Sequence, residues 1–282
     1  MTSTTTHRTG RNLPAAIATG LVLGLVILVT LLWWNWGFVI FASAALTVGV
    51  WEVCRALDAC DMHTARWPLI IGSPIVLVGC YAAGQLIGQP QDAMWIITGG
   101  LAIMMIISLF MRIPGGVQGF VKDVAASAFV IGYLPLLGSS IVLMLASPHG
   151  AGRILCFIVC PIACDTGAYA FGSLFGRHKM APSISPAKSW EGFVGGIVLA
   201  MVVAAIVTHL VLGAPIWVGV LLGLVAGCCG VLGDLVESAI KRDAGLKDMS
   251  HVLPGHGGVM DRLDSMLVAA PAAWLVLYLL VV

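Results

Sequence analysis

The sequence carries very little charge. Only 10% of its 282 residues are Asp, Glu, Lys or Arg, while 60% are hydrophobic and the mean hydropathy is +1.03. A typical soluble domain has about 25% charged residues, so this chain has too few to cover a water-facing surface, and its apolar surface must face lipid. The 14 basic and 13 acidic residues nearly balance. The composition therefore also lacks the basic excess of a nucleic-acid-binding protein, and no nucleic-acid partner is expected.

The eight cysteines lack the pattern of a metal or disulfide site. No histidine or CxxC spacing accompanies them. Cys156, Cys160 and Cys164 repeat every four residues inside an apolar run, which places them on one face of a helix. They are expected to be small packing residues without a chemical role.

A cleavable signal peptide is not expected either. Its apolar core would have about 7–15 residues, whereas the first apolar run extends from Pro14 to Trp34. This run is predicted to remain in the protein as its first membrane span.

Nine apolar runs are long enough for membrane-spanning helices, which need about 20 apolar residues each. The sequence therefore predicts an all-α integral membrane protein with about nine transmembrane helices, at residues 14–34, 36–53, 68–88, 93–111, 124–145, 153–175, 193–212, 215–233 and 263–282. The second run is short, and Pro135 and Pro161 lie inside the fifth and sixth runs. Broken helices are tolerated there if neighbouring helices satisfy the freed backbone groups.

The basic residues predict the orientation, because cytoplasmic loops are rich in Lys and Arg. With nine spans and a cytoplasmic N-terminus, only Arg153 of the 14 basic residues lies outside. The cytoplasmic set is Arg8, Arg11, Arg55, Arg66, Arg112, Lys122, Arg177, Lys179, Lys188, Lys241, Arg242, Lys247 and Arg262. We expect a multi-pass protein of the inner or plasma membrane with a cytoplasmic tail (1–13), about five N-terminal spans (14–150), and a catalytic C-terminal region of about four spans and two polar cytoplasmic loops (151–282).

A stripe of small residues marks the eighth run, where Gly219, Gly223 and Gly227 lie four residues apart. Small residues at this spacing let two helices approach closely in lipid. The stripe predicts close packing of this span against a neighbouring helix.

Most acidic residues cluster in two regions on the predicted cytoplasmic side, the first from Asp165 to Gly192 and the second from Gly233 to Ser265. In the second region, Asp234, Glu237, Ser238 and Lys241 follow the i, i+3, i+4, i+7 pattern. All four side chains share one face if the helix continues beyond the eighth span.

Asp261 and Asp264 lie three residues apart at the start of the last span, directly after the glycine-rich segment 254–258. Glycines there leave backbone N–H groups accessible to a ligand, and a helix N-terminus favours binding of an anion. Two carboxylate pairs around such a loop fit a Mg²⁺–phosphate site, because Mg²⁺ takes oxygen ligands and bridges one or two carboxylates to phosphates. Either pair alone fits salt bridges that cap a helix end equally well.

Asp165 is the acid placed most deeply in a predicted span. A charged side chain is costly there, so an intramembrane acid is functional by default. A structural ion pair with Arg177 or Lys179 is the alternative.

Two further side chains are open to two interpretations each. Lys188, between the hydroxyls of Ser185 and Ser189, fits a phosphate contact or an ordinary positive-inside residue. His256 fits a general base or a hydrogen-bonding loop residue, and phosphoryl-type transfer does not require a base.

At these residues the second region resembles the signature of the phosphatidate cytidylyltransferase (CDP-diacylglycerol synthase) family. The matching positions are Ser238, Ile240, Lys241, Arg242, Lys247, Asp248, Pro254, Gly255, His256, Gly257, Gly258, Asp261, Arg262 and Asp264. Upstream, the segments 165–176 and 185–192 also look like that family, so the resemblance covers roughly residues 150–282.

The resemblance implies that CTP and phosphatidic acid give CDP-diacylglycerol and pyrophosphate with Mg²⁺, in a homodimer whose polar pocket opens to the cytosol and the inner leaflet. It also implies a second, monovalent cation such as K⁺ at the same centre. The family pattern implies that Asp234, Asp261 and Asp264 bind the metal. Together with Lys241 they form the expected catalytic set. The other residues expected to contact the substrates are Asp165, Ser185, Lys188, Ser189, Arg242, Lys247, His256, Gly257, Gly258 and Arg262.

Two other functions fit parts of the sequence. A CTP-dependent polyprenol kinase would phosphorylate a lipid alcohol and would need a base, such as His256 or Asp165. A transporter fits the nine spans and the broken helices. However, the sequence lacks the internal repeat common in transporters, and its acids gather on one side.

Overall fold

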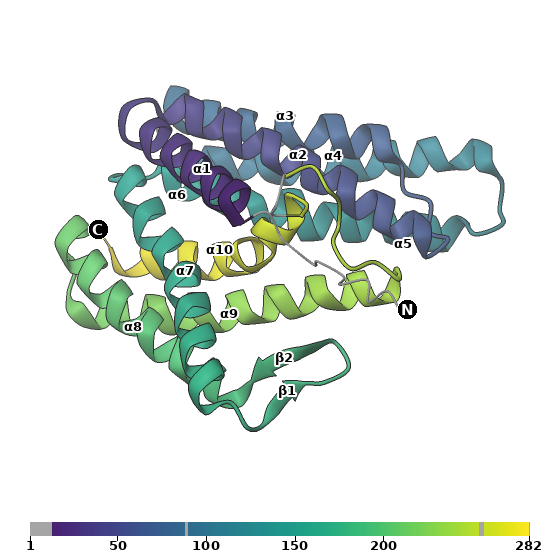
Figure 1. Cartoon of the computed structure of the whole chain (residues 1–282). Coiled ribbons are helices and arrows are strands. Elements are labelled where there is room, and N and C mark those ends of the chain that lie inside the picture. The colour runs from purple at the N-terminus through teal and green to yellow at the C-terminus, as the bar shows by residue number, and fades with distance from the viewer. Residues whose placement is uncertain (1–12, 88–89, 254–256, 282) are drawn as a thin grey trace, which may run out of the picture.

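The computed structural model describes residues 13–87, 90–253 and 257–281, and these residues are almost entirely helical (Figure 1). In chain order the elements are α1 (Leu13–Trp33), α2 (Asn35–Ala59), α3 (Arg66–Ile87), α4 (Pro90–Arg112), η1 (Ile113–Gly115), α5 (Phe120–Ile131), η2 (Gly132–Leu136), α6 (Leu137–Ala146), α7 (Gly150–Phe175), β1 (Lys179–Ala181), β2 (Ser185–Ser189), α8 (Trp190–Leu212), α9 (Ile216–Asp243) and α10 (Met260–Leu280).

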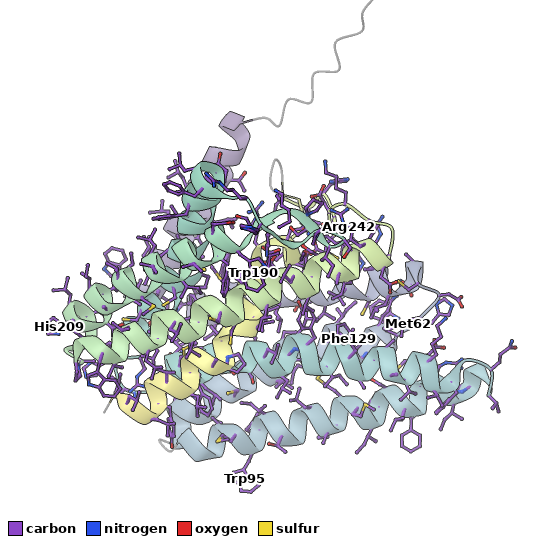
Figure 2. All side chains as sticks on the ribbon, turned by 90° about the horizontal axis from the view of Figure 1, so that it is seen from below. Met62, Trp95, Phe129, Trp190, His209 and Arg242 are labelled. Carbon is purple, nitrogen blue, oxygen red and sulfur yellow. The ribbon has the colours of Figure 1, made fainter. Side chains whose placement is uncertain are left out.

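In the part of the chain that the structure describes, each predicted span lies mainly in helix. Within the described residues, eight stretches are helical, long and apolar enough to cross a membrane, and α1 adds the apolar stretch Ala18–Trp33. Large apolar side chains on the outside support this assignment, because Leu21, Trp95 and Leu210 are 69%, 73% and 76% exposed. Trp95 points away from the helices in Figure 2. The chain is therefore an all-α multi-pass membrane protein, as predicted.

The two prolines inside predicted spans, Pro135 and Pro161, affect their helices differently. Pro135 lies in η2, a π-helical turn that joins α5 and α6 into one span. Pro161 lies inside α7, which continues unbroken to Phe175. The second span is longer than expected, since α2 extends to Ala59 and its polar last turns lie beyond the apolar run.

The glycine stripe of α9 packs against α8, as the spacing predicts. A Cβ atom on Gly219 or Gly223 would lie 2.5 Å from the carbonyl oxygen of Ala204 or Ala200, respectively. Farther along α9, the backbone of Gly233 approaches the carbonyl of Asp264 on α10 just as closely. The same helix is thereby held between α8 and α10, and its acidic face is brought to the start of α10.

The polar connections at one end of the helices contact one another. Asp123 at the start of α5 accepts a hydrogen bond from the His63 N–H (2.8 Å) and pairs with Arg112 (2.6 Å). Nearby, the Cys60 thiol lies 3.8 Å from Asp243 at the end of α9. These contacts join segments that a nine-span path places on one side of the membrane.

Arg153, the one basic residue predicted on the other side, is buried. Its guanidinium donates hydrogen bonds of 2.8 Å to the carbonyls of Pro148, Leu277 and Val281. It therefore caps the C-terminal end of α10, where a positive charge is favourable.

A short antiparallel hairpin, β1–β2, interrupts the helices between α7 and α8 and lies near α9 (Figure 1). The Glu191 carboxylate fixes its base, accepting from the N–H groups of Arg177 (3.1 Å) and His178 (3.2 Å) and contacting His178 Nδ1 (2.6 Å). The sequence did not predict this hairpin, which carries Ser185, Lys188 and Ser189.

Candidate active site

Four elements bring most of the predicted site residues together: α7, β2, α9 and the start of α10. Between α7, the hairpin, α8 and α9 lies a cavity of about 220 Å³. Its lining is Asp165, Ala168, Tyr169, Met180, Ala187, Lys188, Ser189, Gly192, Phe193, Val231 and Asp234. The two polar regions of the sequence therefore meet at one cavity.

An ion pair joins the two regions directly. Lys188 Nζ on β2 lies 2.6 Å from Asp234 Oδ2 on α9, and both side chains are partly exposed to the cavity side. Ser238, one turn farther along α9, donates to Asp234 Oδ1 (3.3 Å). The electrostatic neighbours of Asp165 are Asp234, Lys188 and Arg262.

Lys241 sits between two carboxylates. Its Nζ atom lies 2.8 Å from Asp261 Oδ1 and also pairs with Glu237, which is completely buried. The predicted common face of α9 is thus confirmed, because Asp234 and Ser238 bond to each other and Glu237 and Lys241 form an ion pair. Lys241 therefore joins the acidic face of α9 to the start of α10.

Asp261 also organises the loop before α10. Its Oδ2 atom accepts hydrogen bonds from the backbone N–H groups of Gly258 (2.7 Å) and Met249 (3.1 Å). Gly257 has a φ of +83°, a left-handed conformation that favours glycine, and a Cβ there would lie 2.9 Å from Asp261 Oδ2. The Gly258 N–H, which the sequence suggested for phosphate binding, is directed to Asp261 in this structure.

Asp264 faces α9 without an ion-pair partner among the salt bridges of the described residues. Its Oδ1 atom accepts from the N–H of Ser265 (2.6 Å), and its carboxylate interacts unfavourably with those of Asp234 and Asp165. Repulsion among these three carboxylates favours the binding of a further cation beside them, where Lys188, Lys241 and Arg262 are the counter-charges already present.

The donor set suits Mg²⁺, because it consists of carboxylate oxygens. Within the described residues, no group of three or more His, Cys, Asp or Glu side chains is arranged to hold a metal ion. Mg²⁺ commonly uses one or two carboxylates together with substrate phosphates, so Asp234 and Asp264 fit such a site. Asp261 is less available, since both of its oxygens already accept hydrogen bonds.

The other predicted residues lie around this centre. Ser189 is buried and caps α8, accepting from the Gly192 N–H (3.2 Å). The Arg242 side chain donates to the Ile184 carbonyl (3.3 Å) in the hairpin turn. Three further candidates are accessible: Ser185 on β2 is partly exposed, and Lys247 in the loop before α10 and Arg262 in the first turn of α10 are exposed. His256 lies outside the described residues. The roles of these residues stay predictions.

Sequence reasoning missed two residues from the N-terminal half. Glu52 on α2 is completely buried and contacts the loop before α10. Tyr133 in η2 is 7% exposed, interacts electrostatically with Asp264, and its hydroxyl has no hydrogen-bond partner among the described residues. Glu52 carried the same signal as Asp165, an acid inside an apolar run. A buried tyrosine in an apolar span carries no such signal.

The sequence is similar to a known protein family and to several known proteins. Residues 14–280 match the family described as "Cytidylyltransferase family". The chain is 39% identical over 291 aligned positions to the phosphatidate cytidylyltransferase of Mycobacterium bovis, covering 99% of this chain and 92% of that protein. It is 38% identical over 290 positions to the protein of the same name from Mycobacterium leprae, covering 98% and 90%. A 128-residue stretch is 44% identical to the Haemophilus influenzae protein of that name, covering 44% of each chain.

Proposed function

The chain belongs to the cytidylyltransferase family, and on this premise we propose that it is a phosphatidate cytidylyltransferase, which converts CTP and phosphatidate to CDP-diacylglycerol and pyrophosphate. The observation that carries the proposal is the 39% identity to the Mycobacterium bovis enzyme over 99% of the chain. The geometry supports it, because cations and carboxylates gather beside a cavity in a membrane protein.

The reaction needs little activation of the nucleophile. A phosphate oxygen of the lipid, anionic at neutral pH, attacks the α-phosphorus of CTP, and the bond from that phosphorus to the bridging oxygen of pyrophosphate breaks. No proton has to be removed from the attacking oxygen. The main barrier is the approach of several negative charges and the departure of pyrophosphate, so catalysis depends on positioned positive charge.

The residues of this chain would divide that task. Lys188, at the cavity and held by Asp234, is placed to contact a substrate phosphate. Lys247 and Arg262, both exposed around the loop before α10, are candidates for the triphosphate. Lys241 is held by Glu237 and Asp261, so its first task is to fix the loop and the start of α10.

Asp234 and Asp264 are the residues that would hold Mg²⁺, with Asp165 close enough to add charge. When bound, the ion supplies neutralisation of the triphosphate charge and stabilisation of the leaving pyrophosphate. The same oxygen-rich surroundings suit a monovalent cation such as K⁺. We also propose that the protein lies in the inner or plasma membrane with the N-terminus and the site on the cytoplasmic side, on the basis of the distribution of basic residues. The family resemblance is the ground on which we propose a homodimer.

The test is to incubate the purified protein with labelled CTP and phosphatidate, with and without Mg²⁺. We expect labelled CDP-lipid and pyrophosphate, formed only with Mg²⁺. Lipid phosphate and CDP, obtained with a polyprenol as acceptor, would identify a lipid kinase instead. The absence of any CTP-dependent lipid product under all conditions would overturn the proposal.

A further inference from the structure

Glu52 joins the N-terminal half of the chain to the loop that carries the family signature. It lies on α2 and is 0% exposed. Its Oε1 atom accepts hydrogen bonds from the Ser250 hydroxyl and the Val259 N–H (3.0 Å), and its Oε2 atom accepts from the Met260 N–H (2.6 Å). Three donors from one loop thus converge on a single carboxylate from a distant helix.

Two of these donors lie at the N-terminal end of a helix. Val259 and Met260 are at the start of α10, where the first backbone N–H groups of a helix have no partner within the helix. A carboxylate there satisfies the N–H groups and interacts favourably with the helix dipole. Glu52 therefore caps α10 from α2, a task that a residue of the preceding loop usually performs.

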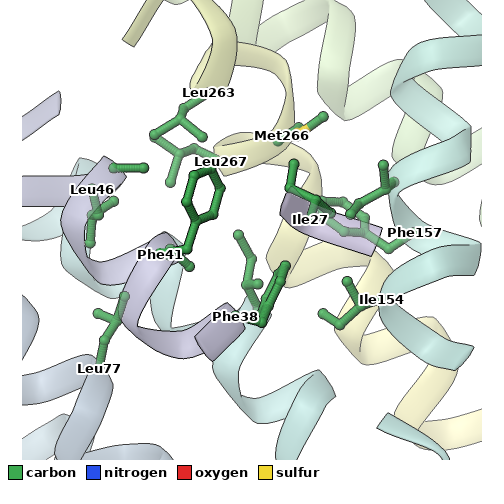
Figure 3. Close-up of a pocket in the computed structure, with 15 residues that line it drawn as sticks. Ile27, Phe38, Phe41, Leu46, Leu77, Ile154, Phe157, Leu263, Met266 and Leu267 are labelled. Atoms are coloured by element: carbon green, nitrogen blue, oxygen red, sulfur yellow. The ribbon is translucent and has the colours of Figure 1, made fainter. Parts of the chain in front are cut away.

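The residues around Glu52 allow the loop to approach its carboxylate closely. A Cβ atom on Gly258 would lie 2.7 Å from Glu52 Oε1, so the chain approaches too closely for a side chain at that position. One turn earlier on α2, Gly49 lies next to α10, because a Cβ there would be in ordinary contact with Met260 Sδ at 3.7 Å. The neighbouring α2–α10 interface is apolar, with Leu46, Leu263 and Leu267 around a cavity of about 80 Å³ (Figure 3). Glu52 is the polar exception at its end.

We propose that Glu52 is a positioning residue for the reaction, which holds Ser250, Val259 and the start of α10 so that Asp261, Asp264 and the exposed cations Lys247 and Arg262 face the substrate. Two carboxylates hold the residues before and at the start of α10. Asp261 accepts from Met249 and Gly258, and Glu52 accepts from Ser250, Val259 and Met260. Asp261 in turn contacts Lys241, so the arrangement extends from α2 through the loop to α9.

The negative charge matters as well as the shape. A buried carboxylate is costly unless hydrogen bonds satisfy it, and here both oxygens serve only as acceptors. In Glu52→Gln, one oxygen becomes an NH₂ group that would face an N–H or O–H donor. The amide therefore keeps the volume and loses at least one of the contacts.

The experiment compares Glu52→Gln with Asp58→Asn, which removes a carboxylate from the end of the same helix, where Asp58 pairs with Arg66. Only the kinetic measurements in this experiment depend on the proposed function. We expect Glu52→Gln to raise the KM for CTP by about tenfold or more, as loss of an orienting partner commonly does, with the KM for phosphatidate unchanged. Hydrogen exchange of the Val259 and Met260 amides should become faster while that of the α8–α9 amides stays slow. Asp58→Asn should alter neither quantity.

Ser250→Ala is the milder variant and keeps the test valid if Glu52→Gln folds poorly. It removes one donor to Glu52, so it should raise the KM for CTP in the same direction, and its effect should not add fully to that of Glu52→Gln. Wild-type exchange at Val259 and Met260 together with an unchanged KM for CTP in both variants would overturn the proposal. So would a loss of kcat in proportion to the folded fraction with every KM unchanged. If the wild-type protein formed no CDP-lipid, the proposed function would fail, and the exchange measurement would still decide the role of Glu52 in holding the loop.

Discussion

Lys188 on β2 and Asp234 on α9 form an ion pair with 2.6 Å between Nζ and Oδ2. This pair joins the hairpin between α7 and α8 to the acidic face of α9 and lies on the wall of the 220 Å³ cavity. The lysine is therefore held in place before substrate arrives, and such preorganised charge is the usual means by which enzymes stabilise charge that develops in a reaction.

Replacement of Lys188 by methionine is the first prediction. We expect kcat for CDP-lipid formation to fall by roughly 100-fold or more, the usual effect of losing one preorganised donor. Lys188→Arg should recover part of the activity, since the charge remains but the geometry changes. The rate of incorporation of labelled CTP into lipid measures both. Lys179→Met is the matched control, because Lys179 is exposed on the other strand of the hairpin. Equal rates for Lys188→Met and Lys179→Met would contradict the role of Lys188.

Asp264→Asn tests the proposed cation site. Asp264, Asp234 and Asp165 repel one another, so removing one charge should leave the apparent melting temperature unchanged or higher. The Mg²⁺ concentration for half-maximal rate should increase by at least about tenfold, because a carboxylate that holds the ion is lost. Asp61→Asn, at a side chain that is 86% exposed, is the control. Normal activity with an unaltered Mg²⁺ dependence would exclude Asp264 from the metal site.

The sequence predicted the parts of this molecule that depend on periodic patterns. The apolar runs predicted the spans, the four-residue spacing of Gly219 and Gly223 predicted the α8–α9 contact, and the positions of Asp234 and Lys241 predicted a common face of α9. Each of these depends on residues close in sequence, so helical geometry alone determines the result.

Contacts between distant segments could not be predicted in this way. Glu52 and the start of α10 are far apart in sequence, and nothing local to Glu52 indicates its partner. The Ser185–Ser189 strand contains a proline and depends on Glu191 and α9 for support, so its own residues do not favour a strand. Arg153 looked like an exception to the charge distribution, and its partners at the end of α10 became visible only in three dimensions.

Gly223→Ala should destabilise the protein through the α8–α9 contact. A Cβ there would lie 2.5 Å from the Ala200 carbonyl oxygen, so the two helices must move apart, at a cost of about 1–3 kcal/mol. Gly99→Ala on α4 is the matched control, because no atom lies within 4 Å of its Cβ position. Thermal unfolding in detergent should show a lower melting temperature for the first variant only. An equal or higher melting temperature for Gly223→Ala would show that the helices adjust without cost.

Tyr133→Phe should not destabilise the fold. The tyrosine hydroxyl is buried and has no hydrogen-bond partner among the described residues, and an unsatisfied buried hydroxyl costs about 1–3 kcal/mol. Its removal is expected to leave the melting temperature unchanged or to raise it. Tyr278→Phe, at a side chain that is 53% exposed, serves as the control. A clear decrease for Tyr133→Phe alone would mean that the hydroxyl has a partner in solution, and a parallel loss of activity would point to the substrate.

Arg153→Met separates stability from catalysis at the far end of α10. The substitution removes a buried charge that donates to the carbonyls of Pro148, Leu277 and Val281, and three carbonyl groups then lose their donor. Hydrogen bonds to charged groups contribute about 1.5–3 kcal/mol each to stability, and lost side-chain entropy and desolvation offset part of this, so we expect a marked decrease in melting temperature. The rate per folded molecule should stay close to that of the wild type, because Asp264 and Asp261 are at the opposite end of the helix. Lys122→Met, which removes a half-exposed partner of Asp61, should change neither quantity. A large loss of kcat at full folding would instead mean that the C-terminal end of α10 controls the position of the acids at its start.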